Sequence, residues 1–386
     1  MMLKIFVLCL IITMSVVSMF ASNSTYLGAS QTSELISYIT LPSSSLPMGI
    51  IYDAENKNVW VALYSNSSIA KIDVATKDVT LYPLPWNVSL DPLYQGPEPW
   101  TIVKSPDDIL WISIRSYSTT PEGETPTYIP YLAKLNPFNN TFTIYWIPHG
   151  SAVSGADIKY AGGYIWYLTA SLLLKINYTS SEIIKTYDTP FYANFMKLYD
   201  NYLWITCREA GEVIRFNLVS ETFDLNVSGF NNPLGIEVDA ENVYIAECSP
   251  ANYGDGTIAI YNKQTETITR IVTVLITNEG PYHVLKDSYN NLWWTDNSGH
   301  IGVMFVNGTK LTLNSEAYCY FMTEVPGYSI WFSAVGSAYI GMVQISVEKP
   351  TPILTIKGPY YSANSVYWIV FDNGPHSHPI RLIENE

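Results

Sequence analysis

The stretch Pro281–Met304, PYHVLKDSYNNLWWTDNSGHIGVM, contains the repeating unit of this chain in its most compact form. An apolar segment leads through a turn into a strand with a central Trp, and a second turn leads into a strand that begins near a Gly. Pro47–Asp73 and Pro233–Asn262 follow the same order. Short apolar segments bounded by Asn, Asp, Ser and Gly are typical of antiparallel strands and their turns.

The aromatic residue at the centre of the second strand occurs seven times, at a spacing of roughly 45 residues with four strand-like pieces per unit. This period is typical of a β-propeller blade. The sequence therefore predicts an all-β protein with one seven-bladed propeller over residues 34–346. The anchoring aromatic residues are Trp60, Trp111, Trp166, Trp204, Tyr244, Trp293 and Trp331.

The first unit predicts four strands, named a to d from the centre of the ring outward. They are Gly49–Tyr52, Val59–Leu63, Ile69–Ile72 and Val79–Tyr82.

The last unit lacks a fourth strand, whereas Glu34–Pro42 (ELISYITLP) has a strand pattern but no unit of its own. Pairing the two would complete the last blade and close the ring, which removes an exposed sheet edge. Residues 347–386 lie outside the repeat, and we expect this proline-rich tail to pack on the propeller.

Residues 1–22 have the pattern of a secretory signal peptide, with Lys4 before the apolar run Ile5–Val17 and small residues at Ser18–Ser22. An uncleaved N-terminal anchor is the alternative. No second apolar run is long enough to span a membrane. We therefore expect the mature chain to be secreted, with association at the cell surface as an option, and without a transmembrane anchor.

Composition also favours an extracellular protein. Only 14% of residues are charged, Tyr occurs 30 times, and the net charge of −14 argues against nucleic-acid binding. This composition resembles that of extracellular proteins from thermoacidophilic archaea. Asn-x-Ser/Thr sites for glycosylation begin at Asn23, Asn66, Asn87, Asn139, Asn177, Asn226 and Asn307.

Three cysteines remain after the signal: Cys207, Cys248 and Cys319. An exported protein can form disulfides. Cys207 and Cys248 lie near equivalent positions of neighbouring blades, so one bridge between them is an interpretation, and three free thiols are the other.

Chemistry is expected where the start of strand a meets the end of strand b, near the central channel. His283 begins one strand a, while Glu247 and Asp296 each lie three residues after their anchor. Such a group could hold Mg²⁺ or Ca²⁺, with Glu247 and Asp296 as ligands, or act as an acid–base pair. The alternative is that both carboxylates accept backbone N–H bonds in the b–c turns.

A second set of side chains is predicted around the same mouth, where aromatic rings and guanidinium groups could clamp an anionic or glycan-like ligand. Packing between blades is the alternative for these residues. They are Arg115, Arg208, Trp100, Tyr192, Tyr282 and Tyr320.

The recurring pattern P-x-G-I-x-x-D, L-W-x-T-[DE] and I-G, clearest in NLWWTD and HIG of Asn291–Gly302, resembles the streptogramin B (virginiamycin B) lyase family and, more broadly, NHL and gluconolactonase-like propellers. The resemblance implies a seven-bladed fold with a magnesium ion held by glutamates and histidine. His283 would match the histidine, and Glu247 and Asp296 the carboxylates. The chain departs from the pattern at Ser249 and Ser298, where a histidine is expected.

Two functions follow. The first is a secreted, glycosylated propeller that binds an extracellular glycan, envelope protein or small molecule, or assembles with itself at the surface. The alternative is a metal-dependent lyase or lactone hydrolase. Binding is favoured because the catalytic set is incomplete.

Overall fold

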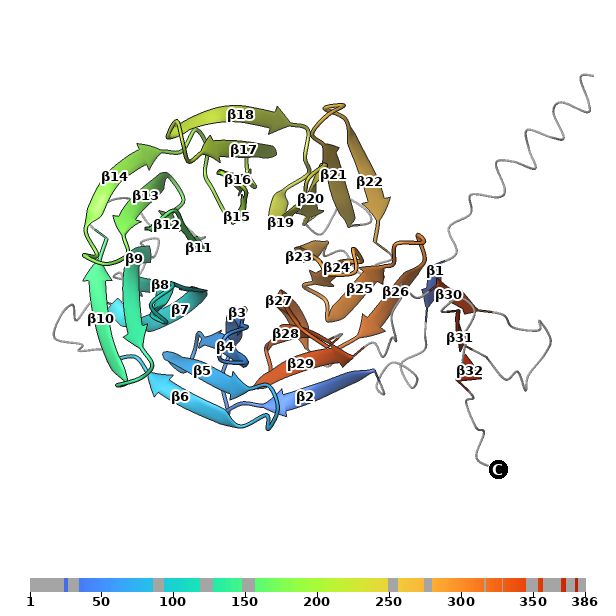
Figure 1. Ribbon diagram of the computed structural model, residues 1–386, viewed down its shortest axis with the longest axis horizontal. Helices are drawn as coiled ribbons and strands as arrows, with labels where there is room; N and C mark the ends of the chain where they lie inside the picture. Colours follow the sequence, from blue (N-terminus) through green and yellow to red (C-terminus); the bar gives the residue numbers. More distant parts are fainter. Residues whose placement is uncertain are drawn as a thin grey trace, which may run out of the picture.

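The computed structural model describes residues 24–26, 35–85, 94–118, 128–147, 157–248, 256–273, 280–315, 317–327, 329–344, 353–356, 369–372 and 379–380. Seven antiparallel sheets stand around a central axis like the blades of a fan (Figure 1). The predicted seven-bladed propeller is confirmed. No helix in these ranges is long and apolar enough to cross a membrane.

Each blade contributes one strand to each of four concentric positions. The innermost a strands are β3 (Pro47–Asp53), β7 (Tyr94–Lys104), β11 (Asp157–Ala161), β15 (Met196–Tyr199), β19 (Pro233–Val238), β23 (Pro281–Lys286) and β27 (Tyr318–Val325). The b strands are β4 (Asn58–Leu63), β8 (Leu110–Ser118), β12 (Tyr164–Leu168), β16 (Tyr202–Cys207), β20 (Asn242–Glu247), β24 (Leu292–Asp296) and β28 (Ser329–Val335).

The c strands are β5 (Ser68–Asp73), β9 (Tyr128–Asn136), β13 (Leu172–Asn177), β17 (Glu212–Asn217), β21 (Thr257–Asn262), β25 (His300–Met304) and β29 (Tyr339–Gln344). The outer d strands are β6 (Val79–Pro83), β10 (Thr141–Trp146), β14 (Ile183–Asp188), β18 (Thr222–Ser228), β22 (Ile268–Val272), β26 (Lys310–Asn314) and β2 (Ile36–Thr40). The first blade thus matches the four predicted strands within two residues at each end.

The outer strand of the seventh blade comes from the N-terminal part of the chain. β2 pairs antiparallel with β29, from Ile36 opposite Val343 to Thr40 opposite Tyr339. The first and last parts of the propeller sequence therefore share one sheet, and β2 and β29 lie side by side in Figure 1. This is the pairing that the orphan strand at Glu34–Pro42 predicts.

Three further strands, β30 (Ile353–Ile356), β31 (Ile369–Asp372) and β32 (Pro379–Ile380), form a separate antiparallel sheet in the C-terminal segment. β1 (Ser24–Tyr26) pairs parallel with β26. The expected signal peptide and most of the tail lie outside the described residues, so the packing of the tail on the propeller stays a prediction.

In two blades, the residue on strand c is small where the residue after the anchor on strand b is large. In the sixth and seventh blades that residue is aromatic, Trp294 or Phe332, and its partner on strand c is a glycine, Gly302 or Gly341 respectively. In the third blade the aromatic residue Tyr167 instead faces Leu174. A Cβ atom at either glycine would overlap the facing ring. Where the residue is aliphatic, the partner can be larger, as in the pair Ile245 and Ala259. In the sixth and seventh blades the b and c strands are therefore matched in volume, as close-packed interiors require.

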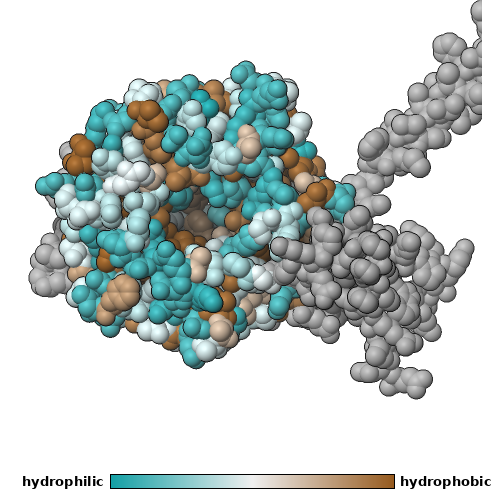
Figure 2. All heavy atoms as spheres, in the orientation of Figure 1, coloured by the Kyte–Doolittle hydropathy of each residue, from teal (hydrophilic) through white to brown (hydrophobic). Residues whose placement is uncertain are grey.

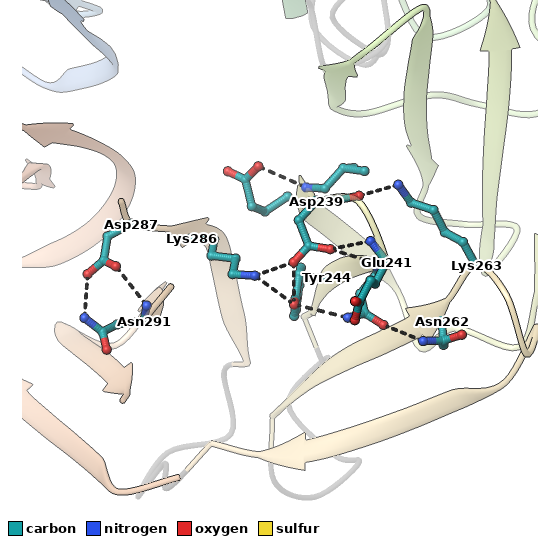
Figure 3. A network of polar contacts seen from close by, with 11 residues as sticks. Asp239, Glu241, Tyr244, Asn262, Lys263, Lys286, Asp287 and Asn291 are labelled. Atoms are coloured by element: carbon teal, nitrogen blue, oxygen red, sulfur yellow. Dashed lines mark hydrogen bonds and ion pairs between the residues drawn. The ribbon is translucent and has the colours of Figure 1, made fainter. Parts of the chain in front are cut away.

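Some neighbouring blades are joined by a lysine on the side of the ring where the a–b turns lie. The lysine is the last residue of its strand a, and it contacts an aspartate of the preceding blade. Lys104 lies 2.8 Å from the buried carboxylate of Asp53. Lys286 bonds Asp239 in the equivalent place, and the Tyr244 hydroxyl donates to the same carboxylate at 2.9 Å (Figure 3). These charge-assisted bonds fix the spacing of the strands that line the channel.

Candidate functional site

Two layers of side chains from the a strands line the central channel. Because side chains alternate along a strand, residues two apart face the same side. The residue opposite each anchor forms one layer, here called the charged layer: Ile51, Val103, Lys159, Lys197, Glu237, Leu285 and Thr323. The residue two places earlier forms the other: Gly49, Thr101, Asp157, Phe195, Gly235, His283 and Phe321.

A cluster of aromatic rings spans the axis at the second layer. Phe195 of the fourth blade and Phe321 of the seventh meet with ring centroids 5.5 Å apart. Trp100 lies 6.0 Å from Phe321, and Tyr282 lies 6.0 Å from Phe195. We call these four residues the aromatic plug. Figure 2 shows the ring hollowed at its centre, with hydrophobic atoms at the bottom of the hollow.

Backbone irregularities and two glycines make the plug fit. Five a strands have a register shift near their start, between Pro281 and His283 for example, and such bulges re-aim side chains. Gly49 lies in the blade between those of Trp100 and Phe321, and a Cβ there would come within 2.5 Å of the Trp100 carbonyl oxygen. Gly235 has the same role in the fifth blade, where a Cβ would lie 2.6 Å from the Cα of His283.

A cavity of about 230 Å³ extends from the plug through the charged layer, on the side of the a–b turns. Its floor includes Phe195, Phe321 and His283. Its wall is charged over three consecutive blades, where Lys159, Lys197, Glu237 and Asp157 line it. In the sixth, seventh and first blades the wall is formed by Leu285, Thr323 and Ile51, and it carries no charge.

The charged side chains form two ion pairs whose carboxylates are buried behind their lysines. Lys159 Nζ lies 2.6 Å from Asp157, and Lys197 Nζ lies 2.7 Å from Glu237. The carboxylate side chains are 5% and 8% exposed, against 27% and 35% for the lysines. Asp157 also accepts the Met196 N–H at 2.9 Å. All four residues line the cavity, and the lysine of each pair is the more exposed partner.

His283 is the polar group of the floor. Its Nδ1 atom is buried and has no hydrogen-bond partner among the described residues. Burial, and then the positive charges of Lys197 and Lys159, lower the pKa of His283 to about 3. The imidazole is therefore neutral at ordinary pH, with one nitrogen available as a donor or an acceptor according to its tautomer.

The structure surrounds Glu247, one of the predicted metal ligands, with hydrogen-bond donors of the protein. Its side chain is buried and receives two bonds of 2.9 Å from the Arg270 guanidinium. The Asn231 N–H donates to it at 2.8 Å, and the Thr257 hydroxyl donates to it as well. Four donors thus occupy its two oxygens.

Asp296 is also bonded within the protein. Its Oδ1 accepts the N–H groups of Ser298 and His300 at 2.9 Å each, and His300 Nδ1 lies 2.9 Å from Oδ2. This is the turn-capping arrangement that the sequence left as the alternative. In the part of the chain that the structure describes, no three His, Cys, Asp or Glu side chains are grouped to hold a metal ion. Of the predicted catalytic group, only His283 lines the cavity.

Most of the predicted aromatic and arginine set does gather, at the aromatic plug itself: Trp100 and Tyr282 belong to the plug, and Arg115 and Tyr320 contact them. Arg115 lies over the Trp100 ring at 3.4 Å, and Tyr282 stacks on Tyr320 with centroids 4.2 Å apart. Burial raises the pKa of Tyr282, while the nearby charges of Arg115 and Arg208 oppose the shift. Tyr192 lies before β15 and is exposed.

The predicted disulfide is not formed. Cys207, Cys248 and Cys319 are all free thiols. Cys207 ends its b strand at the position of Glu247, so Cys248 lies one residue further along and its side chain belongs to the opposite side of the strand. Burial, with a smaller effect from Glu212, raises the pKa of Cys207 to about 12, which makes it a packing residue.

Five of the predicted glycosylation asparagines lie in described segments. Asn139, Asn226 and Asn307 are exposed, whereas Asn66 and Asn177 are partly buried. Asn23 and Asn87 lie outside the described residues.

Sequence reasoning missed Lys159, Lys197, Glu237 and Asp157. A signal was present, since three of them stand opposite their anchors in consecutive units. These three residues stand opposite the anchors, further along the a strands than the predicted site at the ends of the b strands.

Comparison with family models and with curated proteins gives no match. Among solved structures, a streptogramin B lyase aligns with a TM-score of 0.63 and 17% identity, over 80% of this chain and 96% of the other. A catalytically inactive virginiamycin B lyase from Staphylococcus aureus, solved with quinupristin, gives 0.64 and 18%, over 81% and 99%. Hydrazine synthase of Kuenenia stuttgartiensis gives 0.63 and 11%, over 81% and 99%. At these identities the similarity establishes the propeller fold, which supports unrelated functions.

Proposed function

We propose that this protein is an exported, glycosylated propeller that binds a small extracellular molecule in its channel cavity and does not transform it. The observation that carries the proposal is the pair of lysine ammonium groups held in the cavity wall by buried carboxylates. Fixed charges at the edge of a concave, partly apolar cavity are typical of ligand sites.

The donors around the two acids argue for binding over metal-dependent catalysis. A metal ion at Glu247 would have to displace Arg270, and the guanidinium would then lose its buried partner. Separating a buried ion pair costs roughly 3–5 kcal/mol. A metal at Asp296 would compete with two backbone N–H bonds and His300.

Export and glycosylation are supported by the N-terminal pattern and by the exposed asparagines at Asn139, Asn226 and Asn307. A cavity of about 230 Å³ fits a small molecule better than a glycan chain or an envelope protein. These larger partners, or self-assembly, would use the outer surface.

A lyase is the second candidate, because the fold is that of streptogramin B lyase and because His283 presents a neutral imidazole to the channel. Incubation with quinupristin and Mg²⁺, followed by mass spectrometry of the ligand, tests it. We expect no conversion above the protein-free blank. Conversion that is lost in His283→Gln would establish the lyase and overturn the binding proposal.

The acids give a complementary test. We expect Glu247→Gln and Asp296→Asn, alone or together, to lower the stability of the protein without changing its divalent metal content, measured by elemental mass spectrometry. Glu247→Gln should cost about 3 kcal/mol, because Arg270 loses a charged partner. A stoichiometric ion in the wild type that disappears in the double variant would contradict the structural role of these acids.

A further inference from the structure

The charges in the channel cavity are arranged with positive groups in front and negative groups behind. The four charges sum to zero, but the carboxylates of Asp157 and Glu237 are almost fully covered while the lysines are partly exposed. A molecule in the cavity therefore meets ammonium groups first. Resting on the proposed binding function, we infer that the cavity is a site for a small organic anion, a carboxylate with an apolar body.

The lysines have donors to spare for such a ligand. An ammonium group has three N–H donors. Lys159 uses two, for Asp157 and for the Ile158 carbonyl, and Lys197 uses one, for Glu237. Among the described contacts, three N–H groups thus remain on two adjacent blades. Two adjacent cationic donors suit the two oxygens of one carboxylate.

The carboxylates would keep the lysines in place when no ligand is bound. Asp157 is anchored by the N–H groups of Ile158 and Met196 at 2.8 and 2.9 Å, and Glu237 by that of Val238 at 2.9 Å. Anchored acids limit the rotamers of the flexible lysine side chains. Preorganised side chains lose less entropy on binding, and this favours affinity.

The rest of the cavity selects for an apolar body. Ile51 and Leu285 line the uncharged part of the wall on either side of Thr323, and the rings of Phe195 and Phe321 lie at the floor. The buried Nδ1 of His283 offers one further polar contact at the floor. A fully hydrated inorganic anion would leave these apolar surfaces unused, whereas an aromatic or branched carboxylate would cover them.

The test is titration of the full protein with benzoate and, separately, with inorganic phosphate, by isothermal calorimetry. The key variant is Lys197→Met/Glu237→Gln, which removes one ion pair without leaving a bare charge. Its matched control is Lys175→Met/Glu221→Gln, which removes a pair with a 2.6 Å contact outside the cavity. We expect one benzoate per chain, weakened about 10- to 100-fold in the key variant and less than twofold in the control.

A second variant covers the case in which the first does not fold. Leu285→Gln leaves every charge in place, and we expect it to weaken benzoate about tenfold while phosphate binding is unchanged. Equal affinity for phosphate and benzoate would overturn the apolar part of the inference, and equal loss in the key variant and its control would overturn the site. If neither anion binds, the inference of an anion site is also overturned. The proposed binding function fails by a different result, namely conversion of quinupristin.

Discussion

Gly302 lies on strand c directly opposite Trp294, and the indole ring covers the place where a Cβ would stand. Gly302→Ala therefore tests whether the b and c strands are matched in volume. In an open strand this change would stabilise the protein by about 0.4–1 kcal/mol, because alanine restricts the unfolded chain. Here the new methyl group must push the ring away, and Trp294 is only 1% exposed, so the ring has nowhere to move.

Overpacking of a buried site typically costs about 1–3 kcal/mol. After subtraction of the alanine gain, we expect Gly302→Ala to lower the free energy of unfolding by about 1.3 kcal/mol. Urea unfolding followed by tryptophan fluorescence measures this difference. Circular dichroism of the folded variant would show whether the propeller itself is retained.

Gly302→Ala can also be introduced into a variant that lacks the indole ring, Trp294→Ile. When Gly302→Ala is added to Trp294→Ile, the blade carries the same pair of residue types as Ile245 and Ala259 in the preceding blade. In that background Gly302→Ala should be neutral or stabilising by about 0.5 kcal/mol, so the effect of one substitution changes sign. If Gly302→Ala costs the same in both backgrounds, the indole ring is not the cause and the volume-matching argument is wrong.

Three other predictions concern acidity, the closing strand and the blade contacts. The pKa of His283 is about 3 in the folded protein and about 6.5 in the unfolded chain, so the unfolded state binds the proton more tightly. The free energy of unfolding therefore decreases as the pH is lowered from 6.5 to 3, by at most about 1.4 kcal/mol per pH unit. His283→Gln should flatten this decline in urea midpoints measured at pH 7 and 4, and an unchanged slope would contradict the assignment. Deletion of Glu34–Pro42 exposes the edge of β29 and should lower the melting temperature by several degrees with concentration-dependent aggregation, whereas an unchanged melting curve would refute the closing role. Lys104→Met leaves buried Asp53 without its cation and should cost about 3 kcal/mol, against less than about 0.5 for the exposed Lys185→Met, and equal costs by chemical denaturation would show that the clamp adds nothing.

The fold could be predicted because the anchors and turns repeat, and because each of the first six units contains all four strands of its blade. His283 could be placed in the channel for the same reason, since it lies near the start of an a strand. The roles of Glu247 and Asp296 could not, because the groups that bond them, such as Arg270 and His300, come from strands further out. A repeat pattern gives the position of an acid in its blade but not which donor faces it.

The charged wall of the cavity could not be predicted from the sequence for a related reason. Lys159 and Lys197 look like ordinary polar residues of half-buried strands until the register with the anchors shows them side by side. The aromatic plug depends on contacts between blades that are not neighbours, and no periodicity encodes such contacts.

The plug also bears on how the ring folds. In an array of repeats, each unit contacts only its neighbours, and stability is close to a sum of local contributions. Contacts from Phe321 to both Trp100 and Phe195 link the seventh blade to the second and the fourth, across the axis. These contacts can form only after most blades are in place, so they join segments far apart in the chain and raise its contact order. We therefore expect unfolding to be all-or-none, without the blade-by-blade fraying of an open solenoid, and folding to be slow.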